Sequence, residues 1–282
     1  MIPYWDPLVL ELGPVSIAGF GLLVGVGMLV GMVVLVRKLR RDGFDPDMAY
    51  NILIVTLLAA VLGGHLFHIL WYEPEQLVGE GARFAAMWDT LRSGALPASE
   101  DLPKLLQVWH GLSSFGGFFT VALVAPLWVR WHRVSVWPYL DATIVSFTAC
   151  WLFARLGCFV THDHPGLETD FLLGVLGTCP GDAALACHPL GLYEAIWSAG
   201  MWAAFTWAGR LPRHPGFYTG WVFATYGPFR FLLDFLRHPS GDARYLGLTP
   251  AQYGSLVLAV VGVALLVGMR SRPPMRGDQR AG

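Results

Sequence analysis

Charged residues are scarce in this chain. They make up 14% of its 282 residues, whereas hydrophobic residues make up 55%. A soluble globular domain typically carries roughly 25% charged residues, so the charges here are too few to cover a water-facing surface. The scarcity excludes a disordered chain, a soluble enzyme and a nucleic-acid binder. It indicates an integral membrane protein with several spans.

Two further signals are missing. Residues 1–13 contain two acidic residues but no lysine or arginine, so we expect no cleaved signal peptide and a first apolar run that remains as a transmembrane helix. The four cysteines, at positions 150, 158, 179 and 187, form no CxxC pair. This spacing argues against a zinc finger and against a thioredoxin-type site.

Seven apolar runs approach the length of about 20 residues that a bilayer-crossing helix needs. A basic cluster follows every odd-numbered run, which predicts an N-terminus outside and a C-terminus in the cytoplasm. The sequence therefore predicts an all-α, polytopic membrane protein in which residues 1–282 form a single transmembrane domain. The predicted spans are Val15–Val36, Ala49–Tyr72, Leu112–Val129, Val136–Val160, Leu190–Ala208, Gly216–Leu236 and Ala251–Met269.

The longer connections fall on the outer side, at about 73–111, 161–189 and 237–250. Loops of this length at a membrane face usually carry function or cover a site. Within the first of them, Glu73–Gln76 and Phe84–Leu91 are expected to form short helices along the interface.

Charges inside apolar runs are the most informative residues, because each costs at least ~2.5–3.5 kcal/mol at a helix centre. Arg155 and Glu194 lie near the outer ends of their runs, and Arg230, Asp234 and Arg237 share one helix face. A common depth predicts one polar cavity that opens outward. Guanidinium groups match phosphate oxygens, so we expect an anionic phospholipid headgroup there.

Other polar and small residues have plainer interpretations. Asp141, near the cytoplasmic end of its run, is expected to support a helix start or packing. The glycines in and beside the spans are typical of close helix packing. Gly116 and Gly117 follow Ser113 at a span start, where free N–H groups are also suited to an anion.

The outer cysteines admit two interpretations. Cys158, His162, Asp163 and His164, together with Cys187 and His188, contain metal-ligating residue types. A disulfide between Cys179 and Cys187 is the simpler interpretation, because this loop lies on the oxidising side. We therefore expect no metal and no cofactor.

The chain resembles the bacterial prolipoprotein diacylglyceryl transferase family over almost its full length. Five segments carry the resemblance, in the family's order: Trp109–Gly117, Arg155–Phe159, His188–Ala195, Tyr226–Arg237 and Leu248–Gln252. They are similar to the family patterns W-x-GG-x-S-x-HGG, GR-x-GNF, HPSQLYEA, YG-xx-RF-xx-EF-x-R and LT-x-GQ.

This resemblance implies transfer of a diacylglyceryl group from phosphatidylglycerol to the lipobox cysteine of a prolipoprotein, with release of glycerol phosphate. It implies a site facing the periplasm in the bacterial inner membrane. The candidate catalytic residues are Asp163 and Asp234, which stand at family carboxylates, and His65, His68 and His162, which lie near the outer face and could take a thiol proton. The implied substrate-binding residues are Arg155, Arg230, Glu194, Tyr226, Gly116, Gly117, Gly157, Gly166 and Arg237.

The chain departs from the family pattern at several positions. Phe115 replaces the histidine before Gly-Gly, and Cys158 replaces a signature asparagine. Phe20 and His65 stand where the family has a tyrosine and an arginine. A thiol base would then be one of the histidines near the outer face, His164 included. Two alternatives stay open: a paralogue that uses another acceptor, and a non-catalytic lipid-binding envelope factor.

Overall fold

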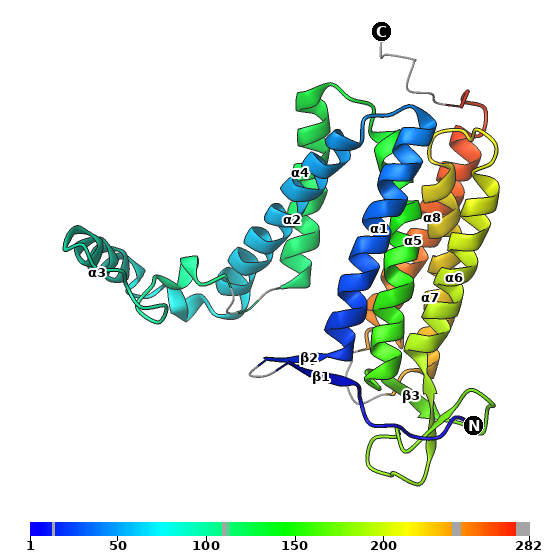
Figure 1. Cartoon of the computed structure of the whole chain (residues 1–282), viewed down its shortest axis with the longest axis horizontal. Helices are drawn as coiled ribbons and strands as arrows, with labels where there is room; N and C mark the ends of the chain where they lie inside the picture. Colours follow the sequence, from blue (N-terminus) through cyan, green and yellow to red (C-terminus); the bar gives the residue numbers. More distant parts are fainter. Residues whose placement is uncertain (13–14, 109–110, 112, 239–243, 275–282) are drawn as a thin grey trace. The chain divides into compact units, whose positions relative to one another are not determined.

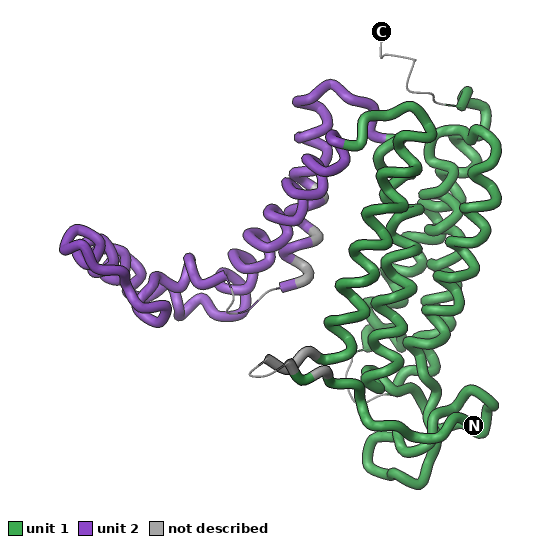
Figure 2. Tube along the Cα trace, viewed as in Figure 1, with its two compact units in different colours: residues 1–46, 137–280, 282 green, residues 47–136, 281 purple. Residues whose placement is uncertain are grey.

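The computed structural model describes residues 1–12, 15–108, 111, 113–238 and 244–274. The chain divides into two compact units (Figure 2). Unit 1 comprises residues 1–46 and 137–280, and unit 2 comprises residues 47–136.

Unit 1 is a bundle of helices that lie side by side (Figure 1). A short connection, residues 209–216, joins α6 to α7 at one end of this bundle. The helices are α1 (Gly19–Asp42), α5 (Val136–Val160), α6 (Leu190–Ala208), α7 (Phe217–Leu233) and α8 (Pro250–Met269), and the 3-10 turn η4 (Asp234–Leu236) extends α7.

Each predicted span coincides with a helix over most of its length, and Leu112, where the third predicted span begins, lies outside the described residues. Four helical segments are also long and apolar enough to cross a membrane: Gly19–Asp42, Pro46–Tyr72, Val136–Val160 and Pro250–Met269. The first span begins later than predicted, at Gly19, because the residues before it form a strand. In the part of the chain that the structure describes, α4, α6 and α7 are helices that do not meet the same criterion of length and hydropathy.

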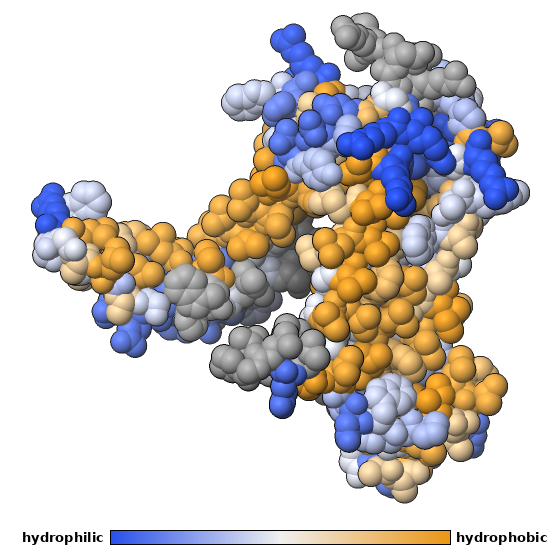
Figure 3. All heavy atoms as spheres, in the orientation of Figure 1, coloured by the Kyte–Doolittle hydropathy of each residue, from blue (hydrophilic) through white to orange (hydrophobic). Residues whose placement is uncertain are grey.

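The bundle surface is strongly apolar (Figure 3), and orange residues cover the middle of the helices between bluer ends. Many large hydrophobic side chains on this surface are exposed, for example Leu29 and Val260, at 71% and 70%. A soluble monomer rarely exposes such contiguous apolar area. This surface is therefore suited to lipid contact.

Short strands were not predicted. β1 (Val9–Leu12) pairs antiparallel with β2 (Val15–Ala18), and an antiparallel sheet of order β3-β5-β4 fills the loop after α5. The strands of this sheet are β3 (Pro165–Glu168), β4 (Val175–Leu176) and β5 (Ala186–Pro189). The chain is thus mostly helical rather than all-α.

The Cys179–Cys187 disulfide is confirmed, and it joins the turn after β4 to β5 with a Cα–Cα distance of 5.2 Å. The same bond removes Cys187 from any metal site. Among the described residues, no group of three or more His, Cys, Asp or Glu side chains is placed to hold a metal.

Unit 2 contains α2 (Pro46–Phe67), which continues as the π-helical turn η1 (His68–Tyr72), and α4 (Ser114–His132). Between them lie η2 (Pro74–Leu77), α3 (Glu80–Arg92) and η3 (Lys104–Leu106). The two expected interface helices therefore both exist as helices. The buried Glu80 carboxylate accepts the backbone N–H groups of Lys104 and Leu105, which fastens η3 to α3.

Asp141 has the supporting role expected of it. Its carboxylate accepts the backbone N–H groups of Gly216 and Thr219 and the Thr219 hydroxyl, at 2.7–3.0 Å. These N–H groups open α7 and have no intrahelical partner. A carboxylate also opposes the positive end of the helix dipole, so Asp141 fixes the start of α7 against α5.

Candidate functional site

An ion pair joins the ends of α5 and α6. Arg155 Nε lies 2.5 Å from Glu194 Oε2, and the Glu194 side chain is only 4% exposed. The Tyr226 hydroxyl donates to the same carboxylate oxygen at 3.3 Å. Gly191 makes this approach possible, because a Cβ there would lie 3.0 Å from the Arg155 carbonyl oxygen.

A second group of charges comes from the end of α7. Arg230 Nη1 lies 3.1 Å from Asp234 Oδ1, and Arg237 Nη1 lies 3.9 Å from the same oxygen. Arg230 Nε is also 3.8 Å from Glu194 Oε1. The predicted convergence of Arg155, Glu194, Arg230, Asp234 and Arg237 is thus present within unit 1.

Thr249 supports this group from the start of α8. Its hydroxyl donates to Asp234 Oδ2 and also accepts the Gln252 N–H, while the Gln252 side chain accepts the Thr249 N–H. This capping box satisfies two N–H groups at the helix start. The Thr-x-x-Gln spacing before an apolar run signals such a cap, but sequence reasoning did not assign Thr249 a role.

A polar cavity of about 200 Å³ lies among these residues. Three arginines and two carboxylates line it, so the lining carries a formal excess of one positive charge. The lining residues are Arg155, Cys158, Asp163, His164, Leu190, Gly191, Glu194, Arg230 and Arg237. Arg155 and Arg230 keep 21% and 18% of their side chains exposed, so an anion can reach both guanidinium groups.

The turn after α5 separates two histidines. His162 and His164 both have positive φ, 55° and 56°. The His162 ring stacks on Tyr4, and its Nε2 donates to the Trp5 carbonyl at 2.8 Å. His164 lines the arginine cavity and His162 does not. Asp163, between them, accepts from the Thr161 hydroxyl at 2.9 Å and also lines the cavity.

Two of the predicted glycines allow close passage of backbone near the site. A Cβ at Gly166 would lie 2.6 Å from the Leu236 carbonyl oxygen, and Gly166 forms a β-bridge with Arg237. A Cβ at Gly157 would lie 3.0 Å from the Phe20 ring. Gly166 therefore holds Arg237 against the sheet, and Gly157 packs α5 against α1.

His65 and His68 lie in unit 2. Each ring nitrogen of the buried His65 faces a carbonyl oxygen, Gly111 at 3.2 Å and Lys104 at 3.0 Å. These contacts place the ring to anchor Lys104 and Gly111. His68 Nε2 lies 3.5 Å from Glu73 Oε2. Their catalytic roles stay predictions.

Gly116 and Gly117 pack α4 against α2. A Cβ at Gly116 would lie 2.3 Å from the Phe67 Cβ, and one at Gly117 would lie 3.2 Å from the Ala60 carbonyl oxygen. Their N–H groups donate to the Ser113 hydroxyl and carbonyl, so neither is available to an anion. Residues 109, 110 and 112 of the same motif, and the Phe115 side chain, lie outside the described residues.

The arrangement in unit 1 is suited to binding a phosphate group and to stabilising charge that develops on it. Guanidinium groups make charge-assisted, two-pronged hydrogen bonds to phosphate, and such preorganised groups are worth most where water is partly excluded. Glu194 and Asp234 hold two of these guanidinium groups in place.

Comparison with known proteins agrees with this chemistry. Residues 7–268 match the family described as prolipoprotein diacylglyceryl transferase. A phosphatidylglycerol–prolipoprotein diacylglyceryl transferase of Chromohalobacter salexigens is 29% identical over 96% of this chain and 95% of its own length. Proteins of the same name from Janthinobacterium and Solidesulfovibrio magneticus are 26% and 29% identical, over 96% and 98% of this chain and 98% of their own lengths.

Proposed function

Because the chain belongs to the prolipoprotein diacylglyceryl transferase family, we propose that it transfers the diacylglyceryl group of phosphatidylglycerol to the lipobox cysteine of a prolipoprotein. One observation carries this proposal beyond family membership. Arg155, Arg230 and Arg237 face one cavity from α5, α7 and the segment after it, and Glu194 lies between the first two. A phosphodiester headgroup is an anion that this cavity can hold.

In the proposed reaction the cysteine thiolate attacks the glycerol carbon that carries the phosphate ester. An S–C bond forms, the C–O bond to phosphate breaks, and glycerol phosphate leaves with one additional negative charge. The arginines stabilise that charge as it develops. The thiolate is the nucleophile, because a thiol is far less reactive.

We propose that His164 is the base that removes the proton from the substrate cysteine thiol. It is the one histidine among the described residues that lines the arginine cavity, and an imidazole titrates close to neutral pH. His162, by contrast, has its Nε2–H engaged with the Trp5 carbonyl. The family histidine that Phe115 replaces is then not required for proton removal in this chain.

We further propose that this membrane protein has seven transmembrane helices, with the N-terminus outside and the C-terminus in the cytoplasm. The basic clusters at the ends of α1 and α4 and after α6 and α8 support this orientation. It places the arginine cavity at the outer face of the inner membrane, where phosphatidylglycerol enters from lipid and a secreted preprotein arrives.

The test uses purified protein in phosphatidylglycerol micelles with a synthetic lipobox peptide. We expect the peptide mass to rise by one diacylglyceryl group, with an equal amount of glycerol phosphate released. Arg230→Ala should reduce turnover at least a hundredfold, because losing one charged transition-state donor costs about 2.7–4 kcal/mol. Arg272→Ala, beyond the other end of the bundle, serves as the control.

The base is tested by a matched pair of variants. His164→Asn should reduce turnover and remove the rise of rate with pH near neutrality, whereas His162→Asn should keep that pH profile. Release of glycerol phosphate without modification of the peptide would instead favour a paralogue with another acceptor. Lipid binding without release of glycerol phosphate would favour a non-catalytic envelope factor.

A further inference from the structure

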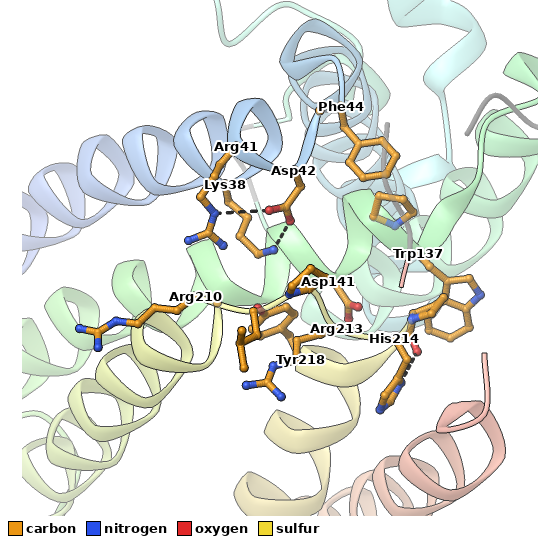
Figure 4. Close-up of a pocket in the computed structure, with 16 residues that line it drawn as sticks. Lys38, Arg41, Asp42, Phe44, Trp137, Asp141, Arg210, Arg213, His214 and Tyr218 are labelled. Atoms are coloured by element: carbon orange, nitrogen blue, oxygen red, sulfur yellow. Dashed lines mark hydrogen bonds and ion pairs between the residues drawn. The ribbon is translucent and has the colours of Figure 1, made fainter. Parts of the chain in front are cut away.

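A second cavity lies at the opposite end of the unit 1 bundle. Its volume is about 500 Å³, larger than that of the arginine cavity. It is enclosed by the end of α1, the start of α5 and the α6–α7 connection (Figure 4). None of its lining residues belongs to the proposed catalytic site.

Basic side chains predominate in this cavity. Four basic residues line it against two acidic ones: Lys38, Arg41, Arg210 and Arg213 against Asp42 and Asp141. Asp141 is buried and its carboxylate already accepts three hydrogen bonds at the start of α7. That carboxylate is therefore committed to holding the start of α7.

Asp42 neutralises part of the remaining charge. Its carboxylate pairs with Lys38 and contacts Arg41 Nε at 3.4 Å. The Arg41 side chain is 51% exposed. Arg213 uses Nε to donate to the Ala208 carbonyl at 2.9 Å, which leaves its terminal nitrogens for another acceptor. Counted formally, the lining carries an excess of two positive charges.

A tyrosine hydroxyl completes the donor set. The Tyr218 side chain is buried. Its hydroxyl makes no hydrogen bond to any residue that the structure describes. A Cβ at Gly209 would lie 2.8 Å from Arg41 Nη2 and 3.3 Å from the Tyr218 hydroxyl. The glycine therefore leaves space in which one ligand can contact both groups.

Figure 4 shows Lys38 and Arg41 extending from α1 near Tyr218 and Arg213 of the α6–α7 region, while the Arg210 side chain extends away from them. Phe44 and Trp137 add apolar surface to the lining. The hydrogen-bond donors thus come from two separate parts of the chain and line one cavity. They are not isolated charges on separate helix ends.

We propose that this cavity binds a phosphate ester anion through Arg41, Arg213 and the Tyr218 hydroxyl. Guanidinium and hydroxyl donors suit phosphate oxygens, and the volume exceeds that of a bare phosphate. The ligand is either the headgroup of an anionic phospholipid or a soluble glycerol phosphate. In the proposed orientation the site faces the cytoplasm and is distinct from the catalytic cavity.

Native mass spectrometry of the full-length protein tests this proposal, with phosphatidylglycerol and glycerol 3-phosphate as probes. The background is Arg230→Ala, which reduces binding at the catalytic cavity, and the readout is binding, which does not depend on the transferase activity. The double variant Arg41→Gln and Arg213→Gln should weaken binding at least tenfold, and Tyr218→Phe should weaken it severalfold.

Arg40→Gln is the matched control. Arg40 is exposed at the same end of α1 and does not line the cavity, so its loss removes one of the two charges that the double variant removes, without removing a donor. We expect less than a twofold change. Equal losses in Arg40→Gln and in the double variant would overturn the proposal, because binding would then reflect general attraction to basic helix ends.

The two probes distinguish the source of the phosphate. Tight binding of phosphatidylglycerol with weak competition by glycerol 3-phosphate supports a lipid headgroup, and the reverse supports a soluble phosphate ester. Binding of neither probe overturns the proposal. Neutral diacylglycerol should not bind, because it lacks the charge that the two arginines require.

Discussion

The ion pair between Arg155 and Glu194 should be strongly coupled to the stability of the protein. We consider Glu194→Gln, Arg155→Gln and the double variant. Removing one partner of a buried pair costs about 3–5 kcal/mol, since the other charge is left buried. The Glu194 side chain is 4% exposed but Arg155 is 21% exposed, so solvent partly screens the arginine that is left when Glu194 is replaced. We therefore expect a coupling free energy of about 2 kcal/mol between the two residues.

The measurement is a double-mutant cycle. The free energy of unfolding would be determined for all four proteins in mixed micelles by denaturant titration, with tryptophan fluorescence as the signal. A coupling of about 2 kcal/mol corresponds to roughly a 30-fold change in an equilibrium constant. The double variant should therefore be more stable than the sum of the two single losses predicts.

A more exposed pair provides the comparison. Arg83, 41% exposed, contacts the buried Glu80 at 2.8 Å in α3, and because solvent screens the arginine more strongly there, we expect a smaller coupling free energy, of about 1 kcal/mol. If the Arg155 and Glu194 substitutions are additive within about 0.5 kcal/mol, the inference that Glu194 holds the phosphate-binding arginine in place is refuted.

Three further predictions follow from the described contacts. Thr249→Val removes the cap of α8 and a hydrogen bond to buried Asp234, so thermal denaturation should report a loss of about 2 kcal/mol, while Thr249→Ser should retain most of the stability. Gly227→Ala places a Cβ 2.6 Å from a backbone oxygen of α8 and should lower the free energy of unfolding by about 1–3 kcal/mol. Gly254→Ala has open space around its Cβ and should be neutral or slightly stabilising. Equal losses of stability in both variants would contradict the packing argument. Burial lowers the pKa of His188 below its usual 6.5, so the unfolded chain binds a proton on this side chain more readily than the folded chain does. The stabilising contribution is therefore complete above pH 6.5 and is lost as the pH falls below that value. His188→Gln should flatten the pH dependence of the denaturation midpoint between pH 7.5 and 5.

The helices and the charges inside them could be predicted from the sequence because both signals are local. Continuous apolar runs located every helix of the bundle, and Val136–Val160 and Leu190–Ala208 have the predicted bounds. Intramembrane charges are costly, so their common depth already indicated one polar site. The short loop between Cys179 and Cys187 similarly indicated their disulfide.

The small strands could not be predicted in the same way. β3, β4 and β5 have two to four residues each, too few to show the alternation by which a strand is recognised. Their pairing depends on how one loop folds back on itself, joining residues about ten to twenty-four positions apart. Nor could a local pattern predict the passage of Gly166 beside Leu236, which holds Arg237 at the cavity.

By itself, the sequence determined the membrane class, the family resemblance and the set of arginines and carboxylates at the site, because hydropathy and motif order are properties of the chain alone. Only the tertiary structure decided which histidine lines the cavity. His162 and His164 are two residues apart in one turn, and left-handed backbone at both directs the first to the Trp5 carbonyl and leaves the second at the arginines. The cavity at the opposite end was equally beyond sequence reasoning, since its basic clusters have an ordinary role in setting orientation and only packing places Arg41, Arg213 and the Tyr218 hydroxyl around one space.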